Sequence, residues 1–343
     1  MKTKIAIVAL LFVGLLCSCR NNGVYNSLLE PFPRVDDCPL NIVSAYSFDS
    51  IGNPDFIFSV GDNILLSEPQ LPLLLSSYNM ERDEYQRFLS KGNGSRELLD
   101  VIQIGSYTDS TFFVKSTFSN NVLIYANDTH DFLQEAPVVE GAVSVVWDNP
   151  ILIASCTGSS RFVLRDTSDG RSIAFGNTDP IGDFSAEQVA SIMQGLCVGN
   201  REEKRFAWAS LYGDLFEIYD YSDTSRIRLV TRQQGELPRT EISEQGYPLT
   251  LPETKLGIVS ITSNDQYIYA LYNENRLVDA LTQRDKIMFC NKILVYDWDG
   301  NPVKALQTDY PIRSIAWNDK HKTLFCVGVD REGMNFHLFS VKE

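Results

Sequence analysis

The sequence predicts an all-β protein, a β-propeller with about six blades of four strands each. Short apolar or alternating runs follow one another from Leu40 onward, and clusters of Asn, Asp, Gly and Ser separate them. This pattern is typical of many short strands joined by turns. A set of strand-like runs also recurs about every 40 to 60 residues, which is the period of a propeller blade.

One repeated heptad is the clearest of these signals, and it covers residues 143–149, 259–265 and 313–319. Each copy reads as a strand that ends in an Asn/Asp turn, and an apolar run that completes a hairpin follows it at once. A third run ends in an acidic residue, at 162–166, 216–220 and 293–297. The first strands of the sets are expected near Asp55, Val101, Val143, Cys197, Val259 and Ile312.

The last set lacks a fourth strand, because the pattern stops after the run at 336–339. The segment 41–46 near the amino end is strand-like and belongs to no set, so we expect it to supply the missing outer strand and close the ring. Closure would leave no open sheet edge. A large two-sheet sandwich, or two separate all-β domains, remains the alternative fold.

Two stretches depart from the strand pattern. Ser185 and Gln188 read as a capping box at the start of a helix, with Gly195 placed to end it. Residues 276–286 form a second, polar and possibly helical stretch. In a propeller, such insertions lie on loops at one face.

The first residues read as a secretory signal, with Lys2 and Lys4 before the apolar run Ile5 to Leu16. That run is twelve residues long, too short to cross a hydrocarbon core that needs about 20. The segment Leu16-Cys17-Ser18-Cys19 resembles the bacterial lipobox. This resemblance implies cleavage before Cys19, acylation of Cys19 and tethering of the mature chain to a membrane. The alternative is an ordinary signal peptide cleaved at another small residue.

The predicted organisation is a lipoprotein signal peptide at 1–18, a lipidated tether at 19–38 and a six-bladed propeller at 39–343. Removal of the signal peptide takes away two lysines and no acidic residue, so the formal charge moves from -14 to -16. Such an acidic surface repels nucleic acid and anionic head groups. We therefore expect a membrane contact through the lipid and no nucleic-acid partner.

The cysteines and histidines predict neither a metal site nor a redox site. Five widely spaced cysteines follow Cys19, at positions 38, 156, 197, 290 and 326, and no Cys-x-x-Cys occurs. Buried free thiols are the expected state, although a disulfide in an oxidising envelope stays open. The three histidines show no metal-ligand spacing, so no metal, cofactor or catalytic residue is nominated.

Two segments resemble motifs of the six-bladed TolB-like propeller lipoproteins of Bacteroidetes. They are Gly92-Asn93-Gly94-Ser95-Arg96-Glu97, and the blade ending from Ile293 to Asn301. The resemblance implies the propeller fold and an outer-membrane lipoprotein in the cell envelope. Surface-exported lipoproteins of these bacteria tend to carry acidic residues after the acylated cysteine, whereas Arg20-Asn21-Asn22-Gly23 follows here. A periplasm-facing orientation is therefore favoured over surface display.

Trp147 and Trp317 occupy equivalent places at the ends of two first strands. They are the candidate ligand-binding residues, as a stacking platform for a sugar or peptide near a channel mouth, and packing between blades is the alternative. We interpret the protein as a non-catalytic binding or scaffold module with a protein or glycan ligand. The other hypothesis is a hydrolase or lactonase-like enzyme with a metal or carboxylate site in the central channel.

Overall fold

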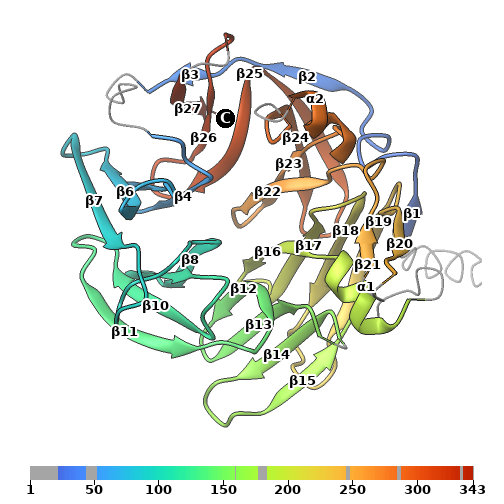
Figure 1. Cartoon of the computed structure of the whole chain (residues 1–343), viewed down its shortest axis with the longest axis horizontal. Helices are drawn as coiled ribbons and strands as arrows, with labels where there is room; N and C mark the ends of the chain where they lie inside the picture. Colours follow the sequence, from blue (N-terminus) through green and yellow to red (C-terminus); the bar gives the residue numbers. More distant parts are fainter. Residues whose placement is uncertain are drawn as a thin grey trace, which may run out of the picture.

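The structure is a computed structural model that describes residues 22–43, 52–158, 160–176, 184–244, 248–283, 287–332 and 335–342. Cys19 and the signal peptide lie outside these residues. Within the described ranges the elements are β-strands, apart from the short helices α1 (Ala186–Ile192) and α2 (Ala280–Gln283) and the 3₁₀ turn η1 (Leu277–Asp279). The all-β prediction is confirmed, and the sheets form a ring around a central axis as in a propeller (Figure 1).

Most of the ring consists of antiparallel sheets whose strands follow one another in chain order. The first two sheets are β4 (Phe56–Val60), β5 (Asn63–Ser67), β6 (Leu73–Asn79) and β7 (Glu84–Ser90), then β8 (Gln103–Thr108), β9 (Thr111–Lys115), β10 (Asn121–Ala126) and β11 (Phe132–Pro137). The next two are β12 (Ala142–Asp148), β13 (Ile151–Cys156), β14 (Phe162–Asp166) and β15 (Ser172–Phe175), then β16 (Gly195–Asn200), β17 (Arg205–Ser210), β18 (Leu215–Asp220) and β19 (Arg228–Gln234).

The remaining strands of the ring form one longer sheet. Its order is β22 (Ile258–Ser263), β23 (Tyr267–Tyr272), β24 (Cys290–Asp297), β25 (Pro302–Asn318), β26 (Thr323–Val329), β27 (Phe336–Lys342) and β3 (Asn41–Ile42). The first part of β25 pairs mainly with β24, and residues 312–318 pair with β26. One long strand therefore ends one group of strands and begins the next. The predicted first strands correspond to β4, β8, β12, β16, β22 and the second part of β25.

A serine in each repeated heptad joins one sheet to the next. In all three heptads a β-bulge directly precedes this serine, which is buried and accepts a hydrogen bond from a backbone N–H of the following inner strand. The pairs are Cys197 N–H to Ser144 at 3.0 Å, Ile315 N–H to Ser260 at 3.1 Å and Ile57 N–H to Ser314 at 3.2 Å. Since an inner strand has an open edge toward the axis, the serines satisfy donors that the sheets leave unpaired.

The amino-terminal segment lies along the outside of the ring, and we call residues 22–42 the belt. Its strands β1 (Asn22–Val24) and β2 (Val35–Cys38) pair parallel to β19 and β25, and β3 pairs antiparallel to β27. Leu28 is fully buried, and the Phe32 ring packs edge-on against Tyr296 at 5.1 Å between centroids.

The belt differs from our expectation of a tether up to residue 38. Its few apolar side chains would not form a core alone, but the sheet edges supply backbone partners and the ring supplies a pocket for Leu28 and Phe32. The chain is therefore fixed to the ring from Asn22 onward. The described cysteines carry free thiols, most of them buried.

Candidate binding face

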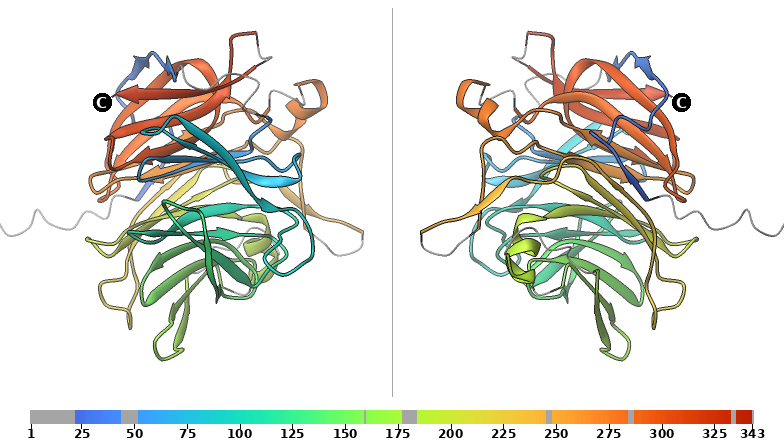
Figure 2. Two further views of the ribbon diagram at one scale, coloured as in Figure 1. Left: turned by 90° about the vertical axis from the view of Figure 1, so that its left-hand side faces the viewer. Right: turned by 90° about the vertical axis from the view of Figure 1, so that its right-hand side faces the viewer.

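The two faces of the ring differ in their loops. Each inner strand runs from one face to the other and ends in a tight turn, so we call the face where these turns lie the hairpin face. The opposite face, the insertion face, carries the long connections 91–102, 235–257 and 273–289. The hairpin of β20 (Thr240–Ile242) and β21 (Pro248–Thr250) and the helix α2 project from this same side (Figure 2).

A cavity of about 740 Å³ follows the axis and is lined by the inner strands. Its half-buried lining side chains include the apolar Phe56, Phe58, Val198, Val259 and Ile261 and the polar Gln103, Thr262 and Asn264. Charged lining residues lie mainly in the turns of the hairpin face: Asp109, Arg201, Glu202, Asp265, Asp319 and Lys320. The volume suits a small ligand, and polar and apolar residues share the lining about equally.

The turn residues that end the heptads hold the turns together. Asn318 accepts a hydrogen bond from the His321 N–H at 2.7 Å and donates to the Gly61 carbonyl of the neighbouring sheet at 2.9 Å. Asn264 likewise accepts from the backbone of its own turn. Within the described ranges no group of three or more His, Cys, Asp or Glu residues is placed to hold a metal ion.

Trp147 and Trp317 both line the cavity, yet only 4% and 7% of their surfaces are exposed. The Trp147 ring packs edge-on against Tyr107 at 4.8 Å, whereas Trp317 stacks on Tyr269 at 5.4 Å. The Trp317 indole also donates to Asp319 at 2.8 Å. The two rings are thus engaged in packing, and ligand stacking on them stays a prediction.

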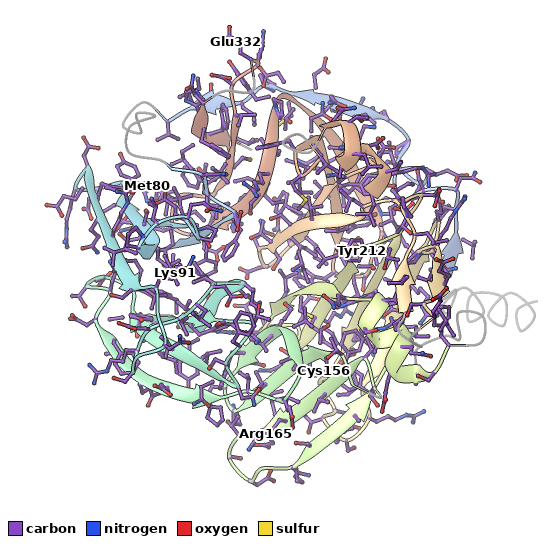
Figure 3. The ribbon with its side chains drawn as sticks, in the orientation of Figure 1. Met80, Lys91, Cys156, Arg165, Tyr212 and Glu332 are labelled. Carbon is purple, nitrogen blue, oxygen red and sulfur yellow. The ribbon has the colours of Figure 1, made fainter. Side chains whose placement is uncertain are left out.

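Several exposed apolar side chains lie on connections of the insertion face. Ile242 and Leu249 on the β20–β21 hairpin are 49% and 46% exposed, and Leu281 on α2 is 82% exposed. Phe118, on the β9–β10 connection of the same face, is 74% exposed. Figure 3 marks Lys91 and Tyr212, which also lie on connections of this face. Loops held on one face of a rigid scaffold commonly carry binding residues.

Ion pairs hold the projecting connections in place. The Arg276 guanidinium donates to both carboxylate oxygens of Glu236, at 3.0 and 2.8 Å, which joins connection 273–289 to connection 235–257. Arg239 adds a third contact to Glu236 at 3.3 Å. The bidentate geometry fixes both partners, and Arg276 keeps the pKa of Glu236 below its usual range.

A buried polar cluster lies at the base of connection 235–257. Asp214 accepts from the Lys255 ammonium at 2.8 Å and from the Tyr272 hydroxyl at 2.9 Å. Burial raises the pKa of Asp214, although Lys255 and Tyr272 oppose this shift. Since unpairing a buried charge is costly, the cluster holds connection 235–257 against β23.

The α1 helix begins as predicted, because Ser185 and Gln188 form a reciprocal capping box. The stretch 276–286 contains η1 and α2, also as predicted. Sequence reasoning missed connection 235–257 with its exposed Ile242 and Leu249. The signal was present as the unusual distance between the run at 216–220 and the next heptad at 259.

Comparisons with known proteins agree with this architecture. The family model described as TolB-like 6-blade propeller-like matches residues 71–320. A solved structure of a putative exported protein from Bacteroides fragilis has a TM-score of 0.55 and 12% identity, covering 88% of this chain and 94% of that one. An auxiliary nutrient binding protein from Bacteroides thetaiotaomicron has a TM-score of 0.52 and 12% identity, covering 86% and 70%. A search of curated proteins gives no match.

Proposed function

Because the chain belongs to the TolB-like 6-blade propeller-like family, we propose that it is a membrane-anchored envelope lipoprotein that binds a protein ligand without catalysis. The observation that carries this proposal is the insertion face, where exposed Ile242, Leu249 and Leu281 stand on connections fixed by Glu236 and Arg276. Apolar side chains on rigid supports lose little entropy when a partner covers them.

The proposed scaffold has six blades, with the long strand β25 shared between the last two. The pairing of Phe339 with Ile42 and of Ser340 with Asn41 supports closure of the last blade by the amino-terminal strand β3. The hydrogen bond from Ile57 N–H to Ser314 supports the junction of the last blade with the first. A closed ring is rigid, which suits a platform for loops.

The proposed anchor is an acylated Cys19, after removal of residues 1–18. The fixed belt shortens the tether to residues 19–21. The neighbour from Bacteroides fragilis is described as a putative exported protein, and this description supports an envelope location. Within the described residues no helix is long and apolar enough to cross a membrane.

Photocrosslinking in the cells that make the protein tests the binding proposal. A photoreactive phenylalanine analogue replaces Leu249 or Leu281 on the insertion face, and Leu133 serves as the control, because it is 51% exposed on the outer strand β11. We expect a defined protein adduct from positions 249 and 281 and none from 133. An adduct with glycan would change the ligand class, and equal yields at all three positions would refute the insertion face as the binding surface.

A further inference from the structure

The axial cavity is a second place for a ligand, separate from the insertion face. We propose that it takes a small organic cation, whose apolar or aromatic body lies between the inner strands and whose positively charged group lies at the hairpin face. Such binding requires neither the proposed protein ligand nor the acylation of Cys19. It goes beyond the proposed function, because it adds a site for a small molecule.

The wall of the cavity offers apolar surface from several sheets. Phe58 of β4, Val198 of β16 and Ile261 of β22 line the cavity, and each is only half-buried although it lies in the middle of an inner strand. These strands belong to three different sheets around the axis (Figure 1). Since covering apolar surface is favourable in proportion to its area, a ligand with an apolar body gains free energy at this level of the cavity.

Polar side chains of the same wall bond to neighbouring strands. The Gln103 amide donates to the Val145 carbonyl and accepts from the Val145 N–H, both at 2.8 Å. Thr262 accepts from the Trp317 N–H at 3.0 Å. These bonds join adjacent inner strands, so the named polar groups already have partners while Phe58, Val198 and Ile261 keep surface open to a ligand.

The described lining carries an excess of negative charge. Its acidic residues are Asp55, Asp109, Glu202, Asp265 and Asp319, and its basic residues are Arg201 and Lys320. Five negative and two positive charges give a formal charge of -3. Both basic groups have partners, because Arg201 donates to the Trp147 carbonyl at 3.1 Å and Lys320 pairs with Asp62 at 2.5 Å. A cleft with one excess sign concentrates ligands of the other sign, so this cavity favours a cation.

Two of the carboxylates lie directly beyond the apolar wall. Glu202 follows β16 and Asp265 follows β22, so both stand in exposed turns of the hairpin face. The Asn200 amide donates to the Asp265 carbonyl at 3.1 Å, which holds the two turns together. A cationic group at these carboxylates stays in contact with water and avoids the cost of burying a charge. Four residues separate each carboxylate from the apolar side chain of its strand, which limits their spacing to ~13 Å at about 3.3 Å per residue.

Calorimetric titration of the full chain with three matched probes tests this proposal. 4-Phenylbutylammonium carries an aromatic body and a cationic group, 4-phenylbutyrate carries the same body with an anionic group, and butylammonium lacks the ring. We expect the Kd of 4-phenylbutylammonium to be at least tenfold lower than that of either other probe. Equal values for the two phenyl probes would overturn the charge assignment, and equal values for the two ammonium probes would overturn the apolar contact. Absence of binding by 4-phenylbutylammonium would overturn the site.

Variants locate the bound probe. Glu202→Gln combined with Asp265→Asn should raise the Kd of 4-phenylbutylammonium severalfold. The matched control, Glu84→Gln combined with Glu135→Gln, removes two exposed charges from the outer strands β7 and β11 and should leave the Kd unchanged. An equal Kd in the two double variants would overturn the hairpin-face position of the cation.

A second variant tests the wall of the cavity. Ile261→Trp adds a bulky ring to the wall and should also weaken binding of 4-phenylbutylammonium, whereas an unchanged Kd would place the probe elsewhere. If Ile261→Trp does not fold, the charge variants still decide, because Glu202 and Asp265 are exposed turn residues whose substitution keeps the fold. None of these measurements depends on the adducts expected at positions 249 and 281, so the small-ligand site and the proposed protein ligand are refuted separately.

Discussion

The serine that joins the last strands of the ring to the first should be a stability determinant. Ser314 is 2% exposed, and its Oγ accepts the Ile57 N–H at 3.2 Å and lies 3.0 Å from the Ser260 Oγ. In Ser314→Ala the buried Ile57 N–H has no acceptor. Since an unsatisfied buried donor costs about 1–3 kcal/mol, we expect the free energy of unfolding to fall by that amount.

Equilibrium urea unfolding of the chain from Asn22 onward, followed by tryptophan fluorescence, measures this loss. The matched control is Ser106→Ala, because Ser106 lies on the inner strand β8 but is exposed. Substitutions at exposed sites usually change stability by no more than about 0.5 kcal/mol. Hydrogen exchange at the Ile57 amide should also accelerate, about tenfold for each 1.4 kcal/mol lost.

The hydroxyl contact between Ser260 and Ser314 makes a second part of this prediction. Residues in direct contact show coupling energies of about 0.5–3 kcal/mol. The loss of unfolding free energy in the double variant should therefore differ from the sum of the losses in the two single variants. If Ser314→Ala is no more destabilised than Ser106→Ala, the serine does not join the sheets as we have argued.

Three further predictions concern buried groups. Burial lowers the pKa of His130 from its ordinary 6.5 to about 4, so the unfolded chain takes up the proton first and stability falls by about 3 kcal/mol between pH 6.5 and 4. His130→Gln should lose this component in unfolding measured across that pH range. Glu217 is fully buried and accepts from Arg161 and Arg232, both at 2.7 Å, so Glu217→Gln should cost about 3–5 kcal/mol in urea unfolding. Phe32→Ala removes a buried ring of the belt and should lower the free energy of unfolding by about 3–5 kcal/mol.

Each of these predictions has a control. If the stability of His130→Gln depends on pH in the same way as that of the unmodified chain, the His130 imidazole does not cause the loss of unfolding free energy between pH 6.5 and 4. Asp169→Asn removes an exposed partner of Arg171 and should cost less than about 1 kcal/mol, so an equal loss in Glu217→Gln would refute the burial argument. Val24→Ala, at an exposed belt position, is the reference for Phe32→Ala.

The repeated heptads illustrate what local pattern could predict. The predicted starts of three inner strands, at Val143, Val259 and Ile312, lie within one residue of the observed start of the strand or of its pairing with the next strand. This agreement is possible because alternation and turn chemistry are local properties of the chain. The same pattern did not predict that the repeated serine accepts a hydrogen bond from the neighbouring sheet. Its partner belongs to the next sheet, far away in sequence, as with Ser314 and Ile57.

The amino-terminal segment and the tryptophans show where local reasoning ended. Nothing in residues 22–38 reads as a packed element, since their strands gain backbone partners only from β19 and β25. Trp147 and Trp317 line the cavity, and their burial depends on contacts with Tyr107 and Tyr269 from other strands, which the sequence pattern does not predict.

The sequence by itself determined the fold class, the strand positions, the capped helix and the acidic charge, because each depends on residues close together in the chain or on composition. The tertiary structure alone decided that the belt is fixed along the ring and that Ile242, Leu249 and Leu281 share one face. The physical reason is that a ring closes through contacts between distant residues, and only this closure sets which loops stand side by side.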